Sequence, residues 1–489
     1  MKTKEKVIIV VGAIIIASLS YWFFWQGFYS VDTYRITSQG YTEYALSDAY
    51  IRDGRLFSAL IISLLGLINP SYKLCYIINL IIAMIISGIT VLKLYEIINY
   101  FKKPKNAKFK ILYFLVSFTF IFNFTVTDIF QFIDSFAIVS SILFYLLALK
   151  KSIIEKKYKI SFVYALLGLI WYQGTITMYI ATAFLMCLLE SKKLKKEFFK
   201  RILPPAIIII LATIINVIMV ALVPVVTNLE ATPRIGGVTR TINVITRNLQ
   251  QFDKIFKDCF GYFPKYLLII FILTTFSTLL IYAIKNKKLE KAITAFILIY
   301  VYISVVFLIF PIQSIELCIR IIISIGECVS ALFIYMICNT EIFENTKIYR
   351  NILSIILCIY FIVTIYNNIK VTKEFILANE LDQKFATTIG TEVEKLRAEG
   401  KEVKYYSVYY TLNGKRLSEM YNSEITFYNS SYLMSRDFYK TFIIFWGNDL
   451  NLEKVMADPE ILEENFDNPS DEEIQIKYIN DILYVIVDL

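Results

Sequence analysis

The sequence predicts an α-helical polytopic membrane protein with a small α/β domain at its C-terminal end. Of its 489 residues, 57% are apolar, and long apolar runs recur as far as residue 366. The charge then changes: 13 basic and 22 acidic residues lie from Lys370 onward, against 37 basic and 19 acidic residues before it. We therefore divide the chain into a transmembrane domain over 1–369 and a C-terminal domain over 370–489.

The apolar runs predict about eleven transmembrane helices. In chain order they cover 7–28, 75–98, 111–126, 136–149, two short helices within 160–189, 202–223, 267–284, 292–310, 320–338 and 352–366. The segments predicted on one side of the membrane hold 25 of the 37 basic residues, and basic residues favour the cytoplasmic side. This distribution predicts a multi-pass cell-membrane protein with a cytoplasmic N-terminus and an extracytoplasmic C-terminal domain.

The C-terminal domain has alternating helix and strand patterns. A helix is expected over 380–399, ended by Gly400, and strands are expected over 403–409, 442–446 and 482–487. The domain has neither a phosphate-binding glycine loop nor a catalytic pattern of residues. We expect it to recognise or cover a substrate rather than to catalyse.

Composition excludes several kinds of chemistry. Histidine is absent, so acid–base catalysis must use Asp, Glu, Tyr or Lys. The seven cysteines lie in or beside apolar runs without paired spacing, which indicates neither a disulfide framework nor a metal site. No cofactor is expected, and a divalent cation is left open but is not indicated. No basic and aromatic pattern predicts nucleic-acid binding.

Although most lysines are predicted on the cytoplasmic side, a set of acids and arginines placed close to the apolar runs falls on the predicted outer side. An amphipathic helix expected over 42–68 would place three of them on one face, at i, i+4 and i+7. Charges this close to hydrocarbon are costly, so they indicate a functional site. The candidate residues are Asp32, Arg35, Asp48, Arg52, Arg55, Asp134, Glu316 and Arg320.

This mixture suits chemistry on an anionic substrate anchored in the membrane. One carboxylate would take the proton of an attacking hydroxyl, and guanidinium groups would hold a phosphate and stabilise it as it leaves. A second interpretation stays open, in which the arginines bind anionic lipid headgroups and the acids balance them. Glu316 and Arg320 also stand one helical turn apart and could simply pair.

Several short motifs, taken in the order in which they occur along the chain, resemble those of the GtrII-type glucosyltransferases. These are polytopic enzymes of the GT-C class. The resemblance covers roughly residues 5 to 370. The matching residues are Asp32 and Arg35, Gly54 and Arg55, Phe132 to Asp134, Tyr172 and Gln173, and Arg320.

The resemblance implies an inverting hexosyltransferase. Its donor would be a polyprenyl-phosphate sugar carrying glucose, a related hexose or an N-acetylhexosamine, and its acceptor an extracytoplasmic cell-envelope glycan. It makes Asp32 the catalytic base, Arg55 and Arg320 phosphate contacts, and Asp134 a sugar or acceptor contact. Membrane lipids, a small lipid-sugar flippase and a donor synthase are the implied partners.

One departure from the family pattern concerns the first loop. The family often has two adjacent acids there, whereas Val31 precedes Asp32 in this chain. A role for the first acid therefore does not carry over, and a metal held by an acid pair is disfavoured.

Two other functions compete with an enzyme. A lipid-linked glycan flippase or other transporter should have internal repeats and charges near the membrane midplane, and neither pattern is found. A scaffold for polysaccharide assembly would leave the clustered outer acids and arginines unexplained. The sequence therefore favours a glycosyltransferase.

Overall fold

The computed structural model describes most of the helical part of the chain and part of the C-terminal sheet. The described residues are 1–30, 33, 36–37, 39–46, 50–51, 54–191, 194–227, 263–308, 319–339, 347–411, 450, 452–456, 460–461, 466 and 474–488.

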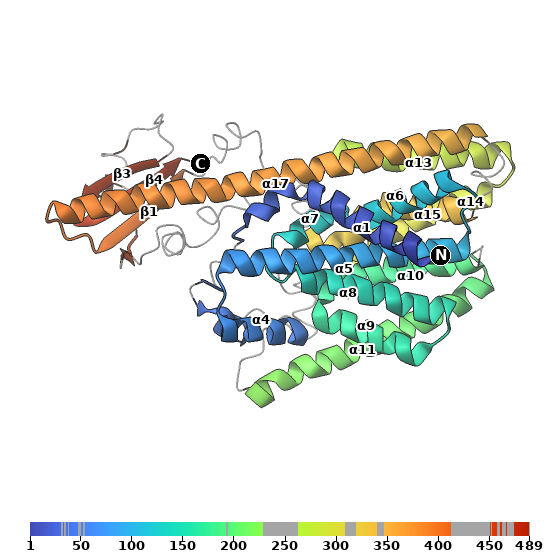
Figure 1. Ribbon diagram of the computed structural model, residues 1–489, viewed down its shortest axis with the longest axis horizontal. Coiled ribbons are helices and arrows are strands. Elements are labelled where there is room, and N and C mark those ends of the chain that lie inside the picture. The colour runs from blue at the N-terminus through green and yellow to red at the C-terminus, as the bar shows by residue number, and fades with distance from the viewer. Residues whose placement is uncertain are drawn as a thin grey trace. The chain divides into compact units, whose positions relative to one another are not determined.

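Helices form most of the described chain before residue 400 (Figure 1). The α-helices are α1 (Thr3–Ser20), α3 (Tyr41–Tyr44), α4 (Leu56–Ile68), α5 (Tyr72–Phe101), α6 (Ala107–Ile121), α7 (Phe124–Phe130), α8 (Ser135–Leu149), α9 (Tyr158–Trp171), α10 (Ile176–Ser191), α11 (Lys196–Thr227), α13 (Lys265–Lys285), α14 (Leu289–Ser304), α15 (Ile323–Asn339) and α17 (Lys347–Ala398). The short helical turns are η1 (Trp22–Gln26), η3 (Lys150–Ile154), η4 (Gln173–Thr175), η5 (Val305–Leu308) and η6 (Ile319–Ile322).

Eight helices of the described part of the chain are long and apolar enough to cross a membrane, and nine if α6 and α7 form one bent span. The apolar helices α4 and α9 are shorter, with 13 and 14 residues. The chain is therefore a mostly helical, polytopic membrane protein. The count of eleven spans stays a prediction.

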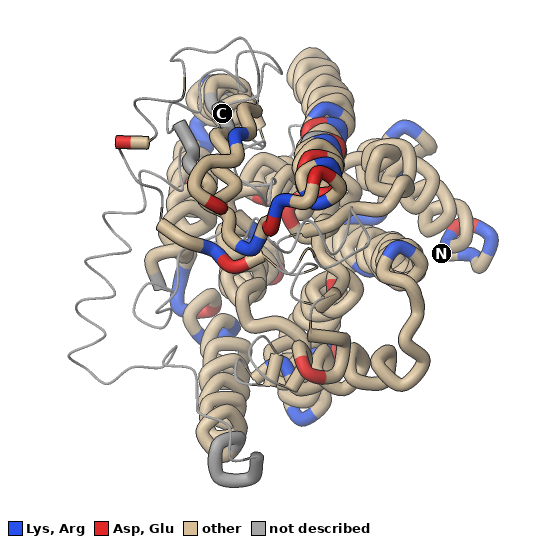
Figure 2. The backbone as a smooth tube through the Cα atoms, turned by 90° about the vertical axis from the view of Figure 1, so that its left-hand side faces the viewer, with Lys and Arg blue, Asp and Glu red and all other residues tan. Residues whose placement is uncertain are grey.

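The packing of α1 on α5 shows how close these helices approach. A Cβ on Gly88 would meet the Cγ1 atom of Ile14 at 2.9 Å and the carbonyl oxygen of Val10 at 3.2 Å. A small residue allows this approach, as is common between membrane helices. Most of the described backbone is neither acidic nor basic, and the charged residues form short separate stretches along it (Figure 2).

The expectation of one amphipathic helix over 42–68 is wrong. The helix α3 ends at Tyr44, and α4 begins only at Leu56. Between them, Gly54 has a φ of +74°, which a right-handed helix does not allow. Arg55 therefore precedes α4 instead of lying on its face.

The chain divides into two compact units, one comprising 1–27 and 41–370 and the other 28–40 and 371–489. The second unit contains a four-stranded sheet in the order β2 (Glu453–Lys454), β1 (Tyr405–Thr411), β4 (Ile482–Asp488), β3 (Ile474–Ile479). The strand β1 is parallel to β2 and β4, whereas β3 is antiparallel to β4.

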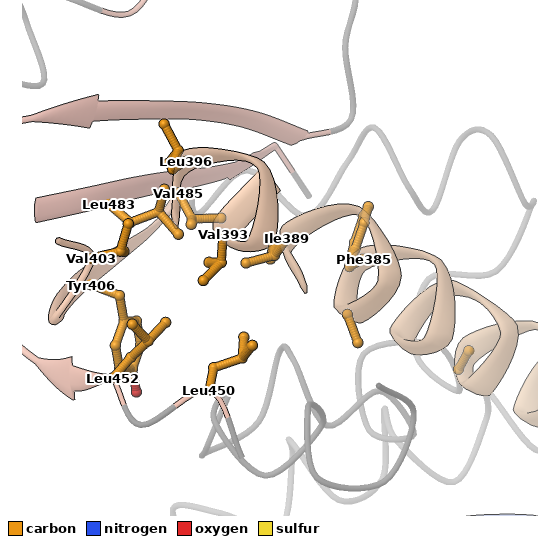
Figure 3. Packing of buried hydrophobic residues seen from close by; sticks show 12 residues of the cluster. Phe385, Ile389, Val393, Leu396, Val403, Tyr406, Leu450, Leu452, Leu483 and Val485 are labelled. Atoms are coloured by element: carbon orange, nitrogen blue, oxygen red, sulfur yellow. The ribbon is translucent and has the colours of Figure 1, made fainter. Parts of the chain in front are cut away.

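The end of α17 packs against this sheet because its apolar residues recur on one face. Phe385, Ile389, Val393 and Leu396 follow the i, i+4, i+8, i+11 spacing of a helical stripe, and each is at most 4% exposed. Figure 3 shows them beside apolar side chains of the sheet and its connections, which are Val403, Tyr406, Leu450, Leu452, Leu483 and Val485. The helix ends at Ala398, before Gly400 with its φ of +81°, as the sequence predicts.

Candidate functional site

The candidate site begins at a break between α6 and α7, whose axes differ by 55°. Asn123 lies in the break, and its side-chain oxygen accepts a hydrogen bond of 3.0 Å from the backbone N–H of Thr125, which caps α7. All seven residues of α7 are buried. This short helix carries Asp128 into the interior of the bundle, where a carboxylate requires a compensating charge.

Arg320 supplies that charge from the turn η6. Its Nη1 donates to Oδ2 of Asp128 at 3.1 Å, and its Nε donates to the hydroxyl of Tyr172 at 2.9 Å. Its guanidinium carbon lies 4.4 Å from the centre of the Phe132 ring. The other carboxylate oxygen of Asp128 accepts a hydrogen bond from the side-chain amide of Gln131. Both carboxylate oxygens are thus engaged.

A second arginine–aspartate pair involves Arg55 and Asp134. The Nη1 of Arg55 lies 3.9 Å from Oδ2 of Asp134, and its guanidinium carbon lies 4.6 Å from the centre of the Tyr172 ring. The Tyr50 ring is farther from that carbon, at 6.0 Å. Asp134 immediately precedes α8, but its side chain does not cap that helix. The carboxylate is therefore directed to the arginine.

Gly54 sets the position of Arg55. Besides its φ of +74°, a Cβ at this position would lie 2.2 Å from Cγ2 of Val220 and 3.1 Å from Nε2 of Gln173. A larger residue would have to displace α11 or the turn η4. The glycine therefore lets the segment before α4 approach Gln173 closely.

Tyr172 joins the two pairs. It follows α9 and precedes η4, its hydroxyl accepts from Arg320, and its ring faces Arg55. The preceding Trp171 is held by α4: its carbonyl accepts a hydrogen bond of 3.2 Å from Ser58, and its ring stacks on Phe57 at 5.4 Å. The orientation of Tyr172 thus depends on α4 as well as on α9.

The aspartate side chains of this site are less exposed than the arginine side chains. The side chains of Asp128 and Asp134 are only 7% and 6% exposed, whereas those of Arg320 and Arg55 are 21% and 16% exposed. The buried acids therefore hold the arginines from the interior side, and the arginines are the more accessible partners. A bound anion could reach the guanidinium groups, whose forked N–H donors match a phosphate.

Four of the predicted site residues lie at this site: Arg55, Asp134, Gln173 and Arg320. Five predicted site residues lie outside the part of the chain that the structure describes. These are Asp32, Arg35, Asp48, Arg52 and Glu316. The predicted pairing of Arg320 with Glu316 therefore stays a prediction beside its observed contact with Asp128.

Three residues of the site are not among the predicted site residues, although the last two belong to the family motifs named above: Asp128, Phe132 and Tyr172. Asp128 lies, like Asp134, between the helices predicted over 111–126 and 136–149, and Tyr172 is adjacent to Gln173. The sequence positions of Asp128 and Tyr172 therefore already indicated that they lie near the site. No signal indicates that Phe132 lies under a guanidinium group, because that contact joins residues 188 positions apart.

The segment on either side of Asp32 has described residues in the second unit. The side chain of Asn379 on α17 accepts from the backbone N–H of Tyr29 at 2.7 Å and donates to its carbonyl at 3.0 Å. The Phe28 and Phe375 rings meet edge to face at 5.3 Å. These contacts hold Phe28 and Tyr29 against α17 within the second unit.

No group of three or more Cys, Asp or Glu side chains that could hold a metal ion occurs among the described residues.

The fold and the site define a class of protein: a polytopic membrane protein with two arginine–aspartate pairs held at one end of buried helices. The chain belongs to the glucosyl transferase GtrII family, whose model matches residues 21–338. The match includes all the residues of the candidate site and ends before α17 and the sheet. No curated protein and no solved structure matches the chain. Family membership makes the protein a membrane glycosyltransferase.

Proposed function

We propose that the protein transfers a hexosyl group from a polyprenyl-phosphate carrier to a hydroxyl of an extracytoplasmic cell-envelope glycan, with inversion. The acceptor oxygen attacks the anomeric carbon, the bond from that carbon to the phosphate oxygen breaks, and the phosphate leaves with the electron pair. The acceptor proton passes to an aspartate. Glucose fits the family, and a related hexose or N-acetylhexosamine fits the same chemistry.

The observation that carries the proposal is the pair of partly exposed guanidinium groups on either side of Tyr172. A leaving phosphate gains negative charge as the glycosidic bond breaks, and positioned arginines stabilise that charge without reorganising. Two forked donors also fix the phosphate orientation better than two ammonium groups would. We assign Arg55 and Arg320 to the donor phosphate, and Asp134 and Gln173 to the sugar or acceptor.

The family resemblance favours Asp32 as the base, and we assign that role to it, with Arg35, Asp48, Arg52 and Glu316 as further substrate contacts. The two acids of the described site already have other contacts: the oxygens of Asp128 accept hydrogen bonds from Arg320 and Gln131, and Asp134 faces Arg55. Inverting transfer needs only this one base on the acceptor side.

A polyprenyl-phosphate donor places the reaction at the outer face of the cell membrane. The lysine distribution supports a cytoplasmic N-terminus and an extracytoplasmic C-terminal domain. A donor synthase and a small lipid-sugar flippase would then supply the substrate. Single cysteines replacing Ser38 and Lys103 in a cysteine-free chain test this orientation. An impermeant thiol reagent should label intact cells at position 38 only, and the reverse pattern would contradict it.

The function itself is tested by supplying the purified protein with polyprenyl-phosphate glucose and an envelope glycan that lacks its side branch. The proposal predicts one added hexose per acceptor unit, detected by mass spectrometry. Cells without the protein should lose only that side-branch sugar. Loss of the whole polymer, with no transfer by the purified protein, would instead indicate an assembly or transport role.

A further inference from the structure

A glutamate is buried among the membrane helices away from the candidate site. Glu327 lies on α15, its side chain is 0% exposed, and neither of its carboxylate oxygens has a hydrogen-bond partner among the described residues. No described lysine or arginine pairs with it. An uncompensated carboxylate in such a place is strongly unfavourable, so a buried ionisable group within membrane helices indicates a function.

Three other buried hydroxyl side chains belong to the same region of the bundle, and none of them is hydrogen-bonded to Glu327. Tyr302 on α14 is close enough to Glu327 to interact electrostatically, and its hydroxyl lies beside that of Thr182 on α10. Ser324 is one helical turn before Glu327 on α15. All three residues are at most 1% exposed. We name these four residues the Glu327 cluster.

The helix packing places the Glu327 cluster at one level of the bundle. The hydroxyl of Thr177, near the start of α10, donates to the carbonyl of Ile321, just before α15, at 2.9 Å. Because α10 and α15 begin at the same end and pack along each other, Thr182 reaches the level of the first turns of α15. Glu327 stands seven positions after Arg320, which corresponds to a rise of about 10 Å along a helix. The cluster is thus distinct from the arginine–aspartate pairs.

Few other titratable groups face this position. Besides Tyr302, the next residue on α15 is the buried thiol Cys328. Tyr360 on α17 donates to the carbonyl of Gly326 at 3.5 Å, and the polar Asn123 also approaches Gly326. None of these side chains carries a positive charge. The described surroundings therefore do not compensate a negative charge on Glu327.

We propose that the Glu327 cluster is a binding site for one small monovalent cation, either a proton on the carboxylate or Na⁺ among the four side chains. Oxygen ligands alone suit a hard cation, and one carboxylate balances one positive charge. A divalent ion is disfavoured, because no group of three or more Cys, Asp or Glu side chains that could hold a metal ion occurs among the described residues. Bound charge removes the penalty of burying the carboxylate and completes the unmet hydrogen bonds.

The test uses the full chain in lipid nanodiscs and needs no sugar transfer, so its outcome is independent of the proposed function. Thermal unfolding is followed in NaCl and in KCl at equal ionic strength, and infrared difference spectra are recorded for Glu327→Gln against the natural protein. If the cation is Na⁺, the melting temperature should be higher in NaCl by several degrees, and Glu327→Gln should abolish that difference.

If the cation is a proton, the melting temperature should be the same in NaCl and in KCl. The infrared spectrum of the natural protein should then show the carbonyl stretch of a protonated carboxyl group, and Glu327→Gln should remove it. Tyr302→Phe and Thr182→Val keep the test decisive if Glu327→Gln fails to fold, because each should weaken the Na⁺ effect or shift that stretch. Glu96→Gln is the matched control, since Glu96 pairs with Lys6 and Lys93 and should change neither readout. Equivalent salts together with no such carbonyl stretch would overturn the proposal.

Discussion

The two arginine–aspartate pairs of the candidate site differ in the geometry of their described contacts. Arg320 donates to Asp128 at 3.1 Å and to the Tyr172 hydroxyl at 2.9 Å. Arg55 has its Nη1 at 3.9 Å from Asp134, beyond hydrogen-bond length, and meets Tyr172 through the ring face. Among the described contacts, Arg320 thus has two directional hydrogen bonds, whereas Arg55 has a longer ion pair and a ring contact.

This difference suggests a division of work around Tyr172. The fixed Arg320 provides a preorganised charge for the leaving phosphate, which costs no reorganisation during the reaction. Arg55 has the longer contact with its acid and meets the other side of Tyr172. In both pairs the buried acid serves to hold the arginine, so the comparison predicts that neither acid is the base.

Replacing the proposed base should have the largest effect. Asp32→Asn keeps the shape of the side chain but removes its ability to accept a proton, so the transfer rate should fall by about two to four orders of magnitude. Donor binding and expression should be unchanged. Initial rates at saturating donor measure this, with Asp128→Asn and Asp134→Asn as comparisons. Near-normal turnover by Asp32→Asn would contradict the assignment, and a selective loss at Asp134 would move the base there.

Neutralising each of the two paired acids should lower the free energy of unfolding by different amounts. Asp128→Asn removes the carboxylate charge that Arg320 contacts at 3.1 Å and should lower the free energy of unfolding by about 2 kcal/mol. Asp134→Asn should lower it by less than about 1 kcal/mol, because its contact is longer. Chemical unfolding in detergent measures both, with Glu392→Gln in an exposed pair as the control. Equal losses would mean that the pairs do not differ as described.

A smaller effect is expected at the residue that joins the pairs. Tyr172→Phe removes the hydroxyl that accepts from Arg320 but keeps the ring beneath Arg55, so one hydrogen bond of about 1 kcal/mol is lost. The kcat/KM for the donor should fall about fivefold. Tyr172→Leu removes both contacts and should reduce it further. If the two variants behave alike, the ring contact with Arg55 contributes nothing to the reaction.

Much of the fold could be predicted from the sequence, because apolar runs of membrane-spanning length identify helices directly. Residues such as Arg55, Asp134 and Arg320 could be predicted because charges beside such runs are costly. The pairing of Arg320 with Asp128 could not, because it joins positions 192 apart in the chain.

Two local features also lay beyond the sequence. Gly54 lies in the break within the helix expected over 42–68, and the presence of one glycine in a sequence does not reveal that its φ is positive. The contacts of Tyr29 with Asn379, 350 positions later, depend on tertiary packing that no local pattern encodes.

The most direct test of the account measures kcat/KM for the polyprenyl-phosphate donor in Arg55→Lys and Arg320→Lys. A lysine keeps the charge but has no planar fork, so each variant should lose about tenfold or more, with the greater loss at Arg320. Arg201→Lys is the control, because Arg201 pairs with Glu190 and Glu197 outside the site and should leave the rate unchanged. Lysine variants as active as the natural protein would contradict a phosphate role for both arginines.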